Sequence, residues 1–266
     1  MKFAKGEARD PRGYRQRVRS ADLTTFRVTV KETDLLVSAE RDLTEEVLAS
    51  VWEYRHQIEK YIAWYPEFKE TLRPYEVDPL APRIVREMAE AAKKVGVGPM
   101  ASVAGAIAEF VGRDLLSLSP QIILENGGDI FLVTGVERKV SIFTESRFFP
   151  SFIDLRIRPE RTPLGVCTSS GKEGPSLSLG RADAVMVVSP SAVLADAAAT
   201  AAGNLVKSKR DVPQAIDFLR AVPQITGAAV LAGGEIGFWG EIELIEADAK
   251  GKAGRRYERS INHSGN

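Results

Sequence analysis

Two patterns of apolar and polar positions near the N-terminus predict a β-hairpin followed by a helix. The runs FRVTV and LLVSAE, within residues 26–40, alternate in polarity and flank a polar stretch containing ETD, which is typical of a hairpin. Residues 44–64 instead repeat apolar side chains every three or four positions, which predicts an amphipathic helix. The apolar stripe consists of Val47, Val51, Tyr54, Ile58 and Tyr61. The stripe suits core packing and self-association into a homo-oligomer equally well.

The remainder of the chain mixes predicted helices and strands without strict alternation. Four prolines mark a loop after residue 64, a helix follows over residues 82–95, and glycine and proline break it before a further helix over residues 100–116. Predicted strands cover residues 121–125, 128–134, 139–145, 152–158 and 184–189, with two closing strands around a glycine turn within 225–247. Helices are expected after the strand AVMVVS and over residues 212–222. Because the order is irregular, an α+β fold is favoured over a doubly wound sheet.

Composition narrows the domain organisation and the class of protein. The 266 residues are 44% hydrophobic, and we expect a single domain over residues 21–247. The flanking segments 1–20 and 248–266 are basic, which indicates either polyanion-binding arms or solvated tails. Overall, 36 basic residues balance 36 acidic ones, so the charge does not favour nucleic acid as a partner. A signal-peptide core and a membrane-length apolar run are both missing, so a cytoplasmic protein is expected.

A helix that is almost pure alanine carries a lone acid and a lone hydroxyl. Asp196 and Thr200 lie four residues apart in LADAAATAAGN, so their side chains share one face of the helix. Ser189 or Ser191 caps this helix. Capping and the helix dipole would explain an acid in the first turn, but Asp196 lies beyond that turn. The pair could be a solvent-facing Asp beside a back-bonded Thr, or the oxygen ligands of a hard cation such as Mg²⁺.

Two glycines interrupt a strand pattern in ENGGDIF, residues 125–131. Glycine within a strand marks a bulge, a tight hairpin turn or the close approach of a ligand to the backbone. The polar residues Asn126 and Asp129 flank the pair. A structural turn and a ligand-binding turn both remain open.

Small hydroxyl residues precede a glycine in GVCTSSGK, residues 165–172. Such a stretch can cradle a phosphate through backbone N–H groups, although the glycine spacing differs from a Walker A loop. Cys167 is either a nucleophile or a buried structural thiol. The histidines, His56 and His263, fall in a predicted helix and in the tail, which disfavours a Cys–His couple.

The helix that begins in GPMASVAGAIAEFVG, residues 98–112, gathers small residues on one face. They are Ala101, Ala104, Gly105 and Ala108. Small side chains favour close packing against another helix. Alternatively, the entry at Gly98–Pro99 exposes backbone groups to a binding cleft.

Taken in chain order, these four motifs resemble the ApbE-like flavin transferase family. That family carries a glycine-rich helix entry, then Asn-x-Gly-Gly-Asp-Ile, then Thr-Ser-Gly, then a strand and a helix with Ala-Asp-x-x-x-Thr. The matching segments are Gly98–Glu109, Asn126–Ile130, Thr168–Gly171 and Ala195–Thr200, within residues 95–205. The resemblance implies an α+β fold, ApbE-like and related to the T-fold, whose mixed, largely antiparallel sheets pack against helices.

The resemblance also implies ligands and partners. FAD would lie in a cleft formed by two segments, Asn126, Gly127, Gly128, Asp129 and Thr168, Ser169, Ser170, Gly171. Mg²⁺ on its pyrophosphate would be held by Asp196, Thr200 and the backbone carbonyl of Ala101. Family members move FMN onto a threonine of an acceptor protein, or let water take it, and release AMP. The expected partners are a flavin or nucleotide and an acceptor protein, without nucleic acid or membrane.

Departures from the family motifs leave the function open. The family lysine aligns with Ala104, the family histidine has no counterpart, and Met100–Ala101 replace paired glycines. One hypothesis is a Mg²⁺-dependent protein that processes flavin or nucleotide pyrophosphates, by FMN transfer or FAD hydrolysis. The alternatives are a non-catalytic flavin or nucleotide binding module, and a scaffold that has lost its ligand. The sequence assigns no catalytic residue.

Overall fold

The computed structural model describes residues 22–143, 152–169, 180–240 and 242–246 and contains two antiparallel sheets. The larger sheet has eight strands in the order β1-β2-β3-β4-β7-β8-β9-β10, and the smaller has three in the order β11-β6-β5. All strand pairs in both sheets are antiparallel, which confirms the predicted α+β class. The strands are β1 Thr24–Val30, β2 Thr33–Ala39, β3 Ile122–Asn126, β4 Asp129–Val133, β5 Arg138–Phe143, β6 Phe152–Ile157, β7 Leu164–Ser169, β8 Ala184–Ser189, β9 Gly227–Ala232, β10 Glu235–Gly240 and β11 Glu243–Glu246.

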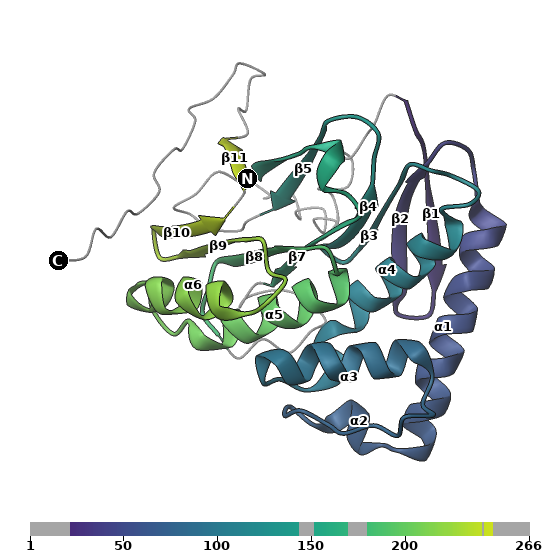
Figure 1. Ribbon diagram of the computed structural model, residues 1–266, viewed down its shortest axis with the longest axis horizontal. Helices are drawn as coiled ribbons and strands as arrows, with labels where there is room; N and C mark the ends of the chain where they lie inside the picture. Colours follow the sequence, from purple (N-terminus) through teal and green to yellow (C-terminus); the bar gives the residue numbers. More distant parts are fainter. Residues whose placement is uncertain (1–21, 144–151, 170–179, 241, 247–266) are drawn as a thin grey trace, which may run out of the picture.

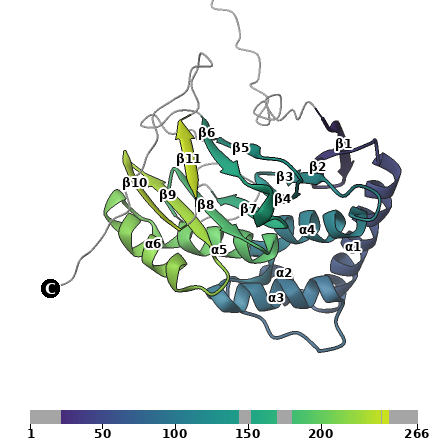
Figure 2. The same ribbon diagram turned by 45° about the horizontal axis from the view of Figure 1, so that its top comes forward.

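Helices cover one face of the large sheet, and the small sheet covers the other (Figure 1). The helices are α1 Thr44–Trp64, α2 Glu67–Glu70, α3 Arg83–Val95, α4 Val103–Leu115, α5 Ala192–Leu205 and α6 Val212–Ala221, with 3₁₀ turns at Pro99–Ser102, Pro159–Arg161 and Lys209–Asp211. Helices α4, α5 and α6 pack on the sheet, and α3 packs beneath α5 as an outer layer (Figure 2). The expected basic segments at both ends lie outside the described residues.

Strand β8 shows why an unbroken apolar run lies in the middle of this arrangement. Val185 and Val187 belong to the core on the helical side, whereas Met186 and Val188 belong to the core beneath the small sheet. Successive side chains of a strand point to opposite faces, so a strand covered on both faces is apolar throughout. The strand predicted over residues 184–189 is therefore confirmed.

The structure confirms helix 44–64 and corrects two other predictions. The stripe residues Val47, Val51, Ile58 and Tyr61 are buried, so this face of α1 serves the core. The helix predicted over residues 100–116 is divided into a 3₁₀ turn and α4. The stretch 165–172 was considered as a phosphate cradle and not predicted as a strand, but Leu164–Ser169 forms strand β7, because β4 and β8 pair with it on both sides.

Glycines let α5 pack closely against α4 and β7. A Cβ on Gly105 of α4 would lie 2.3 Å from the carbonyl oxygen of Ala192, and one on Gly165 of β7 would lie 2.4 Å from the Ala192 Cα. Because these neighbours are backbone atoms, only glycine fits at either position. The small-residue face of the predicted helix is thus a packing surface at Gly105.

Within the described ranges, no single helix is long and apolar enough to cross a membrane. The helical segments Arg83–Val95 and Pro99–Leu115 together have the length and composition of a membrane span, but the chain bends by 103° between them.

Candidate functional site

Asp196 is buried where the middle of α5 meets the start of α4. Ser191 caps α5, so Asp196 is its fifth residue, and it is only 8% exposed. Its Oδ2 accepts a hydrogen bond from the backbone N–H of Gly105 at 2.9 Å. The first N–H groups of a helix have no partner within the helix, and a carboxylate there also suits the helix dipole. The solvent-facing interpretation of Asp196 is therefore wrong.

The glycine pair of ENGGDIF forms the two-residue turn between β3 and β4. Gly127 and Gly128 have φ values of 67° and 105°, which favour glycine, and Asn126 pairs with Asp129 across the turn. The turn is tied to α4, because Asn126 Nδ2 donates to the carbonyl of Ala104 at 3.1 Å. The hairpin interpretation is confirmed, and the hairpin lies beside Asp196.

Strand β7 brings the Thr-Ser segment to the same place. The backbone N–H of Thr168 donates to Asp129 Oδ1 at 3.2 Å, and its hydroxyl donates to the Gly128 carbonyl at 3.1 Å. Ser169 is buried at the end of this strand. The other two residues of the predicted segment, Ser170 and Gly171, lie outside the described residues.

Asp129 and Asp196 form a buried carboxylate pair. Burial raises the pKa of Asp129 well above its usual range, and the charge of Asp196 raises it further. Burial also raises the pKa of Asp196 to about 7, although N–H groups of Gly105 and Ala104 act in the opposite direction. Burial therefore favours the protonated form of both carboxyl groups.

The thiol of Cys167 lies next to this pair and is buried. Its Sγ donates to the carbonyl of Ala192 at 3.4 Å. Burial, followed by the charges of Asp129 and Asp196, raises its pKa well above the usual range. A thiol held protonated in this way is a weak nucleophile, so the structural interpretation of Cys167 holds.

Thr200 and the Ala101 carbonyl, the other oxygen ligands expected around a cation, lie within four residues of Asp196 and Gly105 in the chain. Thr200 follows Asp196 by one turn of α5 and is buried. Ala101 lies in the 3₁₀ turn before α4. In a regular helix its carbonyl would accept from the N–H of Gly105, but that N–H donates to Asp196 instead. Oxygen donors of these kinds are the ligands that Mg²⁺ prefers. The donor set fits a divalent cation that shares a phosphate-bearing ligand.

Among its described residues, this site has no metal cluster made only of protein side chains. Across the residues that the structure describes, no group of three or more His, Cys, Asp or Glu side chains is arranged to hold a metal ion. Mg²⁺ commonly uses one or two carboxylates and completes its coordination with phosphate oxygens and water. The carboxylate pair meets that requirement.

Glu109 is a buried carboxylate whose role the motifs did not reveal. It has no exposed surface, and its Oε2 accepts from the Val193 N–H at 3.0 Å and from the Ser191 hydroxyl at 3.1 Å. Its Oε1 pairs with Arg113 one turn later on α4. Glu109 thereby anchors the start of α5 one turn before Asp196. An acid within the otherwise apolar stretch 103–112 was the available signal, similar to the one that marked Asp196.

We expect the metal-free protein to lose stability as the pH rises from about 5 to 8. The pKa of Asp196 is about 7 in the folded state against an ordinary 3.8, so folding takes up a proton in this window and higher pH favours unfolding. The loss should be on the order of a few kcal/mol of unfolding free energy. Urea unfolding at several pH values, with a chelator present, measures it.

The control variants for this pH series are Asp196→Asn and Asp217→Asn. Asp217 is an exposed residue of α6, so its variant should keep the pH dependence of the wild type. Asp196→Asn should reduce it and leave only the part that comes from the buried Asp129. Equal slopes in all three proteins would contradict an energetic role for the carboxylate pair.

Comparisons with known proteins place the chain in a family. Residues 15–222 match the family model described as AbpE bacteria. A UPF0280 protein of Methanocella arvoryzae is 38% identical over 83% of this chain and 90% of its own length. One from Methanocaldococcus jannaschii is 34% identical over 87% and 97%. The apo structure of the Pseudomonas stutzeri flavinyl transferase ApbE is similar in fold, with a TM-score of 0.54 and 14% identity over 82% of this chain and 93% of that one. The chain therefore belongs to the AbpE bacteria family, an ApbE-like family with the fold of that transferase.

Proposed function

We propose that this chain binds FAD or a related dinucleotide with Mg²⁺ and cleaves its pyrophosphate. FMN would pass to a threonine hydroxyl of an acceptor protein or to water, and AMP would leave. The observation that carries the proposal is the buried Asp129–Asp196 pair, wedged between the start of α4 and the β3–β4 turn. Family membership and the fold similarity to a flavinyl transferase support it.

The pair's environment explains why a cation would be favoured there. Two buried like charges repel each other, and burial already penalises each of them. When bound, Mg²⁺ would neutralise pyrophosphate charge and orient the reacting phosphorus. Asp196, Thr200 and the Ala101 carbonyl are the proposed ligands, with Asp129 as a second charge beside them.

The surrounding residues would position the nucleotide. The side chains of Asn126 and Thr168 hold the glycine turn against α4 and β7. The Gly128 position lacks a side chain, and a Cβ there would lie 2.8 Å from the Thr168 hydroxyl. We propose that Asn126, Gly127, Gly128, Asp129 and Thr168 line the nucleotide cleft, with Ser169, Ser170 and Gly171 continuing it.

The test is to incubate the purified protein with FAD, with Mg²⁺ or with a chelator, and to separate the products by chromatography. We expect AMP and FMN in equal amounts, formed only with Mg²⁺. Products that form equally fast in the chelator would contradict the metal's role. FAD that stays intact under both conditions would contradict its hydrolysis, the arm of the proposal that needs no acceptor protein.

A non-catalytic binding module is the second candidate, and Ala104 favours it. Ala104 lies in the first turn of α4, its carbonyl accepts from Asn126, and its methyl group supplies no positive charge where the family motif has lysine. In that case FAD would co-purify or bind tightly while remaining intact. The same incubation distinguishes the two candidates.

A further inference from the structure

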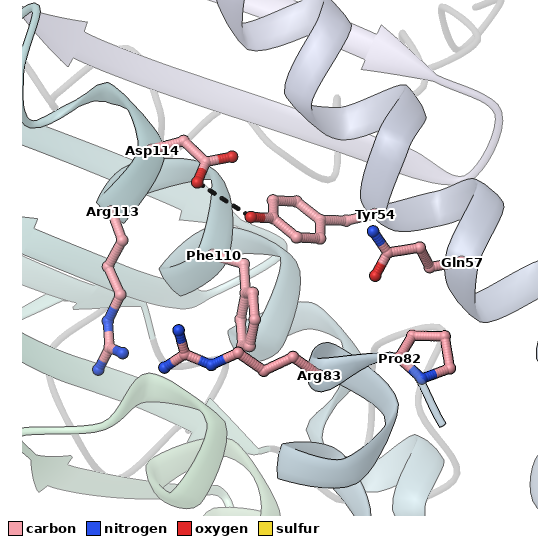
Figure 3. A pocket seen from close by; sticks show the side chains of 7 residues that line it. All are labelled: Tyr54, Gln57, Pro82, Arg83, Phe110, Arg113 and Asp114. Carbon is pink, nitrogen blue, oxygen red and sulfur yellow. Dashed lines mark hydrogen bonds between the residues drawn. The ribbon is translucent and has the colours of Figure 1, made fainter. Parts of the chain in front are cut away.

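A pocket of about 510 Å³ opens between α1, α3 and α4, away from the site described above (Figure 3). Ligand pockets typically measure roughly 300–1,000 Å³. Residues from the last turns of α4 line it, whereas Gly105 and Asp196 meet at the first turn of α4. Arg113 follows Gly105 by eight positions of helix, a rise of about 12 Å along the axis.

Arg83 is held in position at the rim of this pocket. Its Nε donates to Glu87 Oε1 at 2.7 Å, and its guanidinium lies 5.6 Å from the centre of the Phe110 ring. Stacking on an aromatic face and a carboxylate partner together fix a guanidinium plane. Its two Nη groups make no hydrogen bond with any residue in the described ranges, so they are available to a ligand.

Arg113 supplies a second fixed guanidinium. It pairs with Glu109, a carboxylate without exposed surface, while 41% of the Arg113 side chain remains exposed. Figure 3 shows the guanidinium groups of Arg83 and Arg113 on the same side of the pocket. Because each arginine already has a carboxylate partner one turn away on its own helix, ordering the two long side chains on an anion costs less entropy.

The opposite wall is aromatic and carries acceptors. The Tyr54 ring packs edge-on against Phe110 with centroids 5.1 Å apart, and its hydroxyl donates to Asp114 Oδ1 at 3.0 Å. Burial, followed by the Asp114 interaction, raises the pKa of Tyr54 to about 12, so this wall is a neutral phenol. Gln57 stands beside it and offers an amide.

We propose that this pocket binds a small organic anion with a flat ring. Its carboxylate or phosphate would lie between Arg83 and Arg113, and its ring would lie along Tyr54. Guanidinium groups suit either oxyanion. Asp114 favours a ligand that also carries an N–H or O–H donor. This site is separate from the Asp129–Asp196 site and does not depend on the function proposed there.

The test is calorimetric titration of the full chain in Mg²⁺-free buffer with three ligands. They are 4-hydroxybenzoate, AMP and inorganic phosphate. The first carries a ring and a carboxylate, the second carries a ring and a phosphate, and the third is an oxyanion without a ring. We expect at least one ring-bearing anion to bind at least about tenfold more tightly than inorganic phosphate. Whichever of the two binds more tightly is the favoured ring anion for the tests of the variants.

Variants locate the binding. Arg83→Gln should weaken the favoured ring anion by about tenfold or more, since it removes charge-assisted hydrogen bonds. Arg86→Gln, at an exposed arginine on the same helix and outside the pocket lining, should leave affinity within about twofold. Asp196→Asn should also leave it unchanged, which separates this proposal from the function above.

Three results would overturn the proposal. The first is that neither ring-bearing anion shows saturable binding. The second is that Arg83→Gln and Arg86→Gln weaken binding equally, as general electrostatic attraction would. The third is that inorganic phosphate binds as tightly as the ring-bearing anions. Thermal melting of each variant verifies that it is folded before titration.

Discussion

Replacing Asp196 with asparagine is expected to lower Mg²⁺-dependent formation of AMP and FMN from FAD by at least about 10²-fold, because removing charge stabilisation from a reacting centre costs that much. The substitution keeps an oxygen that can accept from the Gly105 N–H and removes one charge of the buried pair. The metal-free variant should therefore be as stable as the wild type at neutral pH, or more stable. Initial rates at several Mg²⁺ concentrations, together with urea unfolding, measure both effects.

A control separates this effect from a general loss of negative charge. Asp217→Asn removes an exposed carboxylate on α6 and should leave the rate unchanged. If Asp196→Asn turns over FAD within about threefold of the wild type, Asp196 is not a metal ligand in the reaction. If the variant is inactive but also unfolded, the comparison moves to Thr200→Val, which removes a proposed ligand without changing charge.

Replacing Gly105 with alanine is expected to destabilise the protein by about 2 kcal/mol, although the same change in a free helix stabilises by about 1 kcal/mol. The added Cβ would lie 2.3 Å from the Ala192 carbonyl oxygen and 2.8 Å from the Asp196 Cβ. Backbone atoms cannot rotate away, so α4 must move from α5, and the bond between Gly105 and Asp196 must stretch. Thermal melting should show a drop of about 4–8 °C.

Gly135→Ala is the matched control for this prediction. Its added Cβ would meet only the Gln121 side chain, at 3.6 Å, which is ordinary van der Waals contact. Its stability should stay within about 0.5 kcal/mol of the wild type. A Gly105→Ala protein as stable as this control would show that α4 and α5 are not locked together at Asp196.

Elements with a strong local period were predictable from the sequence. Helix 44–64 and strand 184–189 begin and end where the pattern placed them, because their periods of apolar residues match the geometry of a helix and of a doubly covered strand. Strand β7 was missed, since its small residues LGVCTS carry little periodicity. Pairing with β4 and β8 decided its conformation instead.

The candidate site was predictable as a set of motifs and not as a geometry. The lone acid in an alanine helix and the glycine pair in a strand both break local preferences, and such breaks mark residues with a role beyond their own element. Their order along the chain also pointed to the family. Nothing in the local pattern indicated that Asp196 accepts from the first turn of α4, or that it lies close enough to Asp129 to raise the pKa of Asp129, because these contacts join segments far apart in the chain.

The sequence by itself determined the α+β class, the helix over residues 44–64, the strand over residues 184–189 and the four motifs. These follow from backbone preferences and from the periodic placement of apolar side chains, which act over a few residues. Only the tertiary structure decided that Asp129 and Asp196 share one buried environment, that Glu109 anchors α5, and that Arg83 and Arg113 face one pocket. The burial of a carboxylate and its interaction with a second charge depend on which elements pack together. At Asp196 both follow from the close approach of α5 to α4 and β7.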